Sequence, residues 1–133
     1  GVGVEANSGL GAEAVAAGTV ARRAAKAAGA ASKRQELLRR IDVAQGSRAV
    51  TDAIEAFLGA GHELPDEQDV FLQMLEHRDE GRVRDAIEKL DRMLTGQLPK
   101  RKPVLVQRLR RIEEDADESE TRDAAAALRR RVA

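Results

Sequence analysis

Residues 81–96, GRVRDAIEKLDRMLTG, give the clearest indication of the fold. Its apolar side chains recur every three or four residues: Val83, Ala86, Ile87, Leu90 and Leu94. This spacing places them on one face of an α-helix, with the charged residues on the opposite face. The same pattern returns around Leu38, Phe57, Phe71, Leu109 and Leu128. The sequence therefore predicts an all-α protein.

The composition agrees with a helical fold. The chain has 133 residues, of which 42% are hydrophobic, and Phe57 and Phe71 are its only aromatic residues. It holds 24 Ala but only four Ile and eleven Val, so the residue types that favour strands are scarce. The lack of Cys excludes disulfides and thiolate metal sites.

A net charge of zero conceals an uneven distribution. Residues 1–50 carry eight basic and four acidic residues, residues 51–98 carry five and twelve, and residues 99–133 carry ten and seven. An acidic middle between two basic ends bears on association more than on the fold.

Three segments are expected along the chain. Residues 1–9 are Gly-rich and predict a flexible lead-in, and residues 10–31 predict an Ala-rich helix. The small face of that helix could support self-association. Residues 32–133 are expected to form a helical-hairpin domain, whose helices begin near capping or Pro residues: Ser32 with Gln35, Ser47, Pro65, Gly81, Pro103, and Asp117 or Ser119.

Two short motifs occur twice in the same order. Asp-Ala-Ile-Glu stands at 52–55 and again at 85–88, and Leu-Pro stands at 64–65 and again at 98–99. The spacings of 33 and 34 residues are typical of repeated helical hairpins.

These repeats resemble the second helix of a tetratricopeptide repeat. The matching residues of one copy are Gly81, Ala86 and Leu90, with Pro99 one residue late, and those of the other are Ala53, Phe57, Ala60 and Pro65. Arg48 stands where the family has Gly, and the first-helix signature is weaker, with Phe71 near the position of the family's Trp. The resemblance covers about residues 33–99.

The resemblance implies antiparallel helical hairpins stacked as a short tetratricopeptide-like solenoid, with a groove that accepts a peptide or helix of a partner. Because Ala and Leu dominate the matching positions, an irregular helical bundle is the alternative.

A row of polar residues offers one candidate site for such a partner. On a helix expected over residues 66–80, four of them share one face, the acidic stripe: Asp69, Gln73, Glu76 and Glu80. This stripe could dock a basic segment, including the Arg-rich end of another copy, although a solvated face is the simpler interpretation.

A basic patch offers a second candidate site. Its members are Lys100, Arg101, Lys102, Arg108 and Arg111. They could contact phosphates of a nucleic acid or of an anionic membrane, whereas a solvated loop between helices is the simpler interpretation.

Catalysis has little support in the sequence. His62 and His77 fit no metal-ligand spacing and are expected to be exposed or helix-end cations, while the Ser residues fit caps and turns. No Gly-rich phosphate loop follows a strand. We therefore expect no enzyme activity, cofactor or metal.

The sequence thus predicts a non-enzymatic protein-protein interaction or scaffolding module, with a basic tether to nucleic acid or anionic membrane as the alternative. Eighteen of its 23 basic residues are Arg, which together with the abundant Ala is typical of a GC-rich bacterial genome. No apolar run is long enough for a membrane span, so a cytoplasmic protein is expected.

Overall fold

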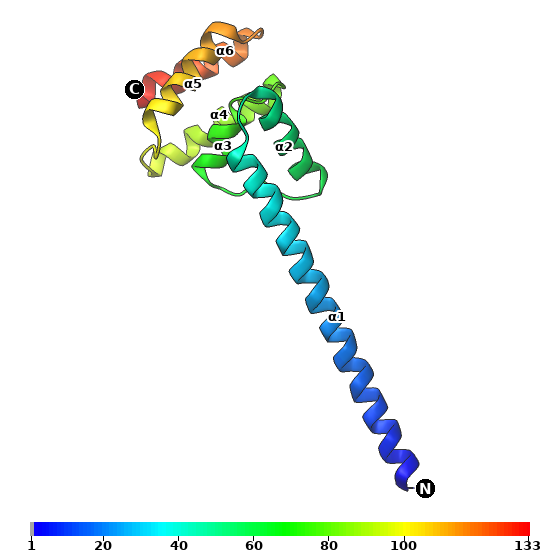
Figure 1. Ribbon diagram of the computed structural model, residues 1–133. Helices are drawn as coiled ribbons and strands as arrows, with labels where there is room; N and C mark the ends of the chain where they lie inside the picture. The colour runs from blue at the N-terminus through cyan, green and yellow to red at the C-terminus, as the bar shows by residue number, and fades with distance from the viewer. Residues whose placement is uncertain (1) are drawn as a thin grey trace. The chain divides into compact units, whose positions relative to one another are not determined.

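The computed structural model describes the backbone of residues 2–133 and the side chains of residues 17–133. Over this range the protein is all-α, which confirms the predicted fold class. Its helices are α1 (Val2–Val43), α2 (Ser47–Gly59), α3 (Gln68–Met74), α4 (Glu80–Gly96), α5 (Lys102–Asp115) and α6 (Ser119–Val132) (Figure 1).

The chain divides into two compact units, Gly1–Glu36 and Leu37–Ala133. In the first unit, the side chains of residues 20–33 are exposed along α1. The second unit, here called the hairpin domain, contains the last residues of α1 and all of α2–α6.

The first helix is longer than the sequence predicts. The expected lead-in, residues 1–9, is helical from Val2 onward, and Gly1 lies outside the described residues. The expected start at Ser32 is wrong, because α1 continues through Ser32 and Gln35 without a break. No Pro interrupts residues 2–43, and each further residue of a formed helix adds a hydrogen bond.

The hairpin domain is built from neighbouring helices joined by short connections. Helix α3 packs against α4, and α5 packs against α6 across the turn at residues 116–118. Helix α6 also packs against α4, and α2 packs against α3. Helices α3 and α4 therefore lie at the centre of this domain.

The predicted apolar faces form its core. The buried residues include Val50, Ile54, Phe57, Val70, Phe71, Met74, Val83, Ile87, Leu90, Leu105, Leu109 and Leu128. Both copies of the repeated tetrapeptide place their Ala-Ile pair in this core, as Ala53–Ile54 and Ala86–Ile87. The motif therefore marks the buried face of α2 and of α4.

The helix starts depend on local backbone chemistry. Gly46, with a φ of 88°, precedes α2 in a conformation that favours Gly, so Ser47 is the first helical residue and not the predicted cap. Asp79 caps α4 by accepting a hydrogen bond from the Gly81 amide at 2.8 Å.

The acidic helix expected over residues 66–80 is wrong in length. Helix α3 begins at Gln68 and ends at Met74, and a turn separates it from α4. Glu80 consequently belongs to α4 and does not extend the face shared by Asp69, Gln73 and Glu76.

No helix of the described part of the chain is both long enough and apolar enough to cross a bilayer.

We predict that the end of α1 is an integral part of the hairpin domain. Ile41 is fully buried, whereas Val43, two residues further on, is 67% exposed. Ile41→Ala should lower the free energy of unfolding by about 2–5 kcal/mol through lost burial and a residual cavity. Val43→Ala is the control and should change it by less than about 0.5 kcal/mol. Urea unfolding monitored by circular dichroism measures both, and equal effects would contradict this assignment.

Candidate functional site

Two glutamine side chains of α3 hold segments that lie far apart in sequence. The Gln73 amide donates to the carbonyl oxygens of Ile41 and Ala44, at 2.9 and 2.8 Å, and so satisfies acceptors at the C-terminal end of α1. The buried Gln68 donates to the Leu98 carbonyl at 2.9 Å and accepts from the Lys100 amide at 3.0 Å. Helix α3 therefore fixes both the end of α1 and the loop between α4 and α5.

Arg108 ties α5 to α3. Its Nη1 donates to the Leu72 carbonyl at 2.8 Å and to Gln73 Oε1 at 3.0 Å, while its Nε lies 3.4 Å from Glu76 Oε1. The Arg108 side chain is only 21% exposed and the Glu76 side chain 19%. This arginine serves the fold, because its donors are directed at α3 rather than at solvent.

The acidic stripe and the basic patch largely meet each other. Asp69 faces Arg101 at 3.9 Å, and Glu76 also lies 3.8 Å from Arg111. Together with Arg108, these contacts link three residues of the stripe to three residues of the patch. Most of the charges that the sequence offers to outside partners are therefore paired within the hairpin domain.

Glu80 has a different role, at the turn before α6. Its carboxylate accepts from the amides of Asp117 and Glu118, at 2.9 and 3.2 Å. The Thr121 hydroxyl hydrogen bond, helped by these amides, lowers the pKa of Glu80 below its ordinary value. Glu80 thus caps the start of α6 from a position on α4.

Further ion pairs join α6 to its two neighbours. On α4, Arg84 pairs with Glu118, and Asp91 Oδ1 lies 2.6 Å from Arg131 Nη2. On α5, Glu113 forms a two-pronged pair with Arg129, whose Nη2 donates at 2.9 Å. The Arg129 hydrogen bond lowers the pKa of Glu113, and that carboxylate in turn raises the pKa of Arg129.

Of the two roles expected for His77, an exposed cation or a helix-end cation, the exposed position is wrong. Its side chain is 2% exposed, and the Asp79 amide donates to its Nδ1 at 2.9 Å. Because Nδ1 accepts, Nε2 carries the proton and donates to Glu55 Oε1 at 3.0 Å. The Arg82 hydrogen bond, assisted by His77, lowers the pKa of Glu55. His62 is half-buried against Phe57, with ring centroids 5.1 Å apart.

Two members of the basic patch stay out of these pairings. Within residues 17–133, the ammonium groups of Lys100 and Lys102 have no ion-pair or hydrogen-bond partner. They follow Leu98, the most exposed large apolar residue of the hairpin domain at 87%. The free charges and the free apolar surface therefore lie together at the start of α5.

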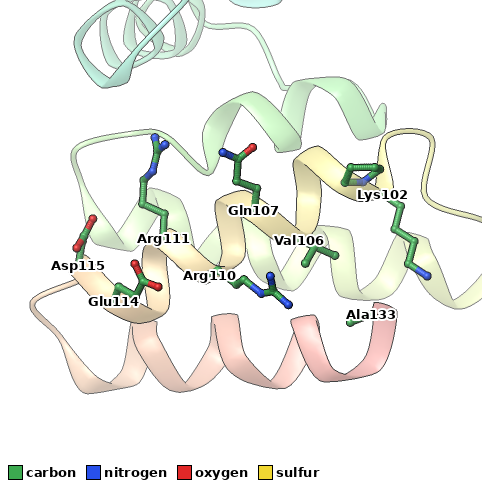
Figure 2. Close-up of a pocket in the computed structure, with 9 residues that line it drawn as sticks. Lys102, Val106, Gln107, Arg110, Arg111, Glu114, Asp115 and Ala133 are labelled. Carbon is green, nitrogen blue, oxygen red and sulfur yellow. The ribbon is translucent and has the colours of Figure 1, made fainter.

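An open groove follows α5 from this point. We call it the α5 groove; it has a volume of about 760 Å³ and is lined by Lys102, Pro103, Val106, Gln107, Arg110, Arg111, Glu114, Asp115 and Ala133. Figure 2 shows Val106 and Arg110 on one side of the α5 ribbon, with Gln107 and Arg111 on the other. Its basic residues precede Glu114 and Asp115, so the groove changes charge along its length.

A second hollow adjoins this groove. We call it the end cavity; it has a volume of about 440 Å³ and is lined by Leu94, Gln97, Leu98, Pro99, Lys102, Arg131 and Val132. Lys102 lines both hollows. No acidic side chain is among the residues that line the end cavity.

The described residues offer no metal centre, because no three of their His, Asp or Glu side chains gather as ligands. A cleft of about 410 Å³ lies near His77, but Glu76, Glu80 and Arg108, which line it, are engaged in the contacts above.

Two surface residues, Leu98 and Val106, are not among the site residues that the sequence predicts. The sequence uses Leu98 only as part of the repeated Leu-Pro motif. Its position directly before the basic loop is the feature that could have indicated a binding role. Val106 lies between the buried positions Leu105 and Leu109 and has no such signal.

Comparison of the chain with protein-family models, with curated proteins and with solved structures finds no match in any of the three. The function therefore has to be inferred from the chain's own residues.

We predict that Arg108 is required for stability and that Arg110 is not. Arg108→Ala leaves Glu76 and the Leu72 carbonyl without this partner and should lower the free energy of unfolding by about 1.5–3 kcal/mol. Arg110→Ala, an exposed change two residues away on α5, should lower it by less than about 0.5 kcal/mol. Chemical denaturation of the two variants tests this, and a stable Arg108→Ala protein would refute the role.

Acid should weaken the hairpin domain through the carboxylates with lowered pKa values. Above the ordinary value of 4.5, Glu80 and Glu113 contribute their full stabilisation, which is lost as the pH falls through their lower folded-state pKa values. Glu113→Gln should be less stable at pH 7 and should lose less stability between pH 5 and pH 3.

The matched control is Glu114→Gln, an exposed change at the next position on α5. Urea midpoints measured across that pH range should follow the wild type for this control. The same pH dependence for Glu113→Gln as for the wild type would contradict the assignment to Glu113.

Proposed function

We propose that this protein is a non-enzymatic interaction module that binds a peptide or helix of a protein partner in the α5 groove. The observation that carries the proposal is that the hairpin domain pairs most of its surface charges internally and leaves one groove open. Most of the acidic stripe and of the basic patch is used to hold the helices together, whereas the α5 groove keeps an open volume of about 760 Å³.

The residues that line the groove could contact a partner segment that lies along α5. Pro103 and Val106 offer apolar contact, and Lys102 and Arg110 flank them with positive charge. Glu114 and Asp115 provide negative charge further along α5. A partner helix with acidic residues opposite Lys102 and basic residues opposite Glu114 would be complementary along the length of the groove.

A protein partner is preferred here over nucleic acid. Arg101 lies against the Asp69 carboxylate of α3, and Arg108 and Arg111 lie against Glu76 in the turn that follows α3, which reduces the positive charge available to phosphates. The described part of the chain also has only two aromatic residues, and both Phe57 and Phe71 are buried, so bases would find no stacking platform on them.

The test starts with the full chain carrying a photo-crosslinking amino acid at Val106, exposed to an extract of the native cells. A chain labelled at Val43 controls for non-specific capture. The partner that Val106 captures is then purified, and its affinity for variants is measured by calorimetry. Val106→Ser with Arg110→Glu should weaken binding by about tenfold or more.

The control variant for that measurement is Val43→Ser with Arg48→Glu, which changes the same residue types at exposed positions outside the groove. It should bind as the wild type does. If the groove variant binds as tightly as this control, the α5 groove is not the binding surface.

A further inference from the structure

The repeated Leu-Pro motif has different surroundings in its two copies. Leu64 is half-buried and packs against the core, whereas Leu98 is 87% exposed. Burial of a leucine side chain is favourable, and because Leu98 is exposed, that contribution becomes available when a partner covers it. The chain therefore covers the leucine of the first copy and leaves the leucine of the second copy exposed.

The residue after each Leu-Pro pair also differs in charge. Asp66 follows the first pair and lies 2.7 Å from the Lys89 ammonium group. Lys100 follows the second pair, and its ammonium group has no ion partner within residues 17–133. The charge after the first Leu-Pro pair is therefore neutralised by Lys89 of the same chain, whereas the positive charge after the second pair has no carboxylate opposite it within residues 17–133.

The walls of the end cavity extend this asymmetry. Leu94, Leu98, Pro99 and Val132 give the end cavity its apolar lining. Of its two cationic residues, Arg131 is paired with Asp91, whereas the ammonium group of Lys102 has no ion partner within residues 17–133. Gln68 holds the loop from beneath, through the Leu98 carbonyl and the Lys100 amide, so the backbone that presents Leu98 is fixed before any partner arrives.

We infer that the end cavity is an anchoring site for an acidic peptide segment that carries a large apolar side chain. The apolar side chain packs against Leu98, and its neighbouring carboxylates pair with Lys102, which lines the cavity, and with Lys100, which lies outside the lining but only two residues after Leu98. The inference deepens the proposed function and depends on it, because Lys102 also lines the α5 groove and joins the anchor to it.

The experiment uses the full chain and three short synthetic peptides that share one central Leu. The first peptide flanks that Leu with Glu, the second with Gln and the third with Lys. Fluorescence anisotropy at low and high salt gives each affinity. The Glu peptide should bind most tightly and should weaken with salt, because its ion pairs lie at the surface. The Lys peptide should not bind.

Variants of the protein locate the site. Leu98→Ser should weaken the Glu peptide by about tenfold or more, the equivalent of losing a buried leucine contact. Lys100→Gln with Lys102→Gln should also weaken it and should flatten its salt dependence. The controls are Val43→Ser for the exposed apolar residue and Lys26→Gln with Lys33→Gln for the lysines, and these should bind as the wild type does.

Three results would overturn the inference. They are binding of the Glu peptide that is unchanged by Leu98→Ser, binding of the Lys peptide as tight as that of the Glu peptide, and no binding of the Glu peptide at millimolar concentration. Any of them leaves the α5 groove to be judged by its own crosslinking experiment. A partner captured there but insensitive to the Leu98 and lysine variants would uphold the groove and refute the anchor.

Discussion

The hydrogen bonds of the Gln73 side-chain amide connect three helices of the hairpin domain. Helix α3 has seven residues, too few for a helix that is stable alone in water. Gln73 donates to two carbonyl oxygens at the end of α1 and accepts from Arg108 of α5. One amide therefore joins the first, third and fifth helices. On the same short helix, Phe71 and Met74 are buried in the core.

The core was predictable from the sequence because buried apolar residues recur every three or four positions along a helix. Val83, Ile87 and Leu90 recur at helical spacing, and α4 buries all of them. The glutamines were not predictable in the same way. An amide that binds backbone groups about 30 residues away leaves no periodic pattern in the sequence, which therefore predicts Gln73 only as part of a surface stripe. The length of α1 was missed because capping residues at Ser32 suggest a start without requiring one.

The candidate site was predictable only in part, because the sequence does not show which charged residues are paired in the folded protein. The sequence identifies the basic patch, but whether a charge is free depends on what folds against it. Arg108 is directed into α3, while Lys102, six residues earlier, reaches solvent at the start of the helix. The exposure of Leu98 depends in the same way on packing, since Leu64 in the other Leu-Pro pair is half-buried.

The position of Glu80 has a consequence for the order in which the domain forms. The amides of Asp117 and Glu118, at the start of α6, bind a carboxylate that lies 37 and 38 residues earlier in the chain. Before α4 and α6 meet, these amides have only water as an acceptor. The hydrogen bonds to Glu80 therefore form only when α6 docks on α4, so this part of the stabilisation at the start of α6 is tertiary and not local.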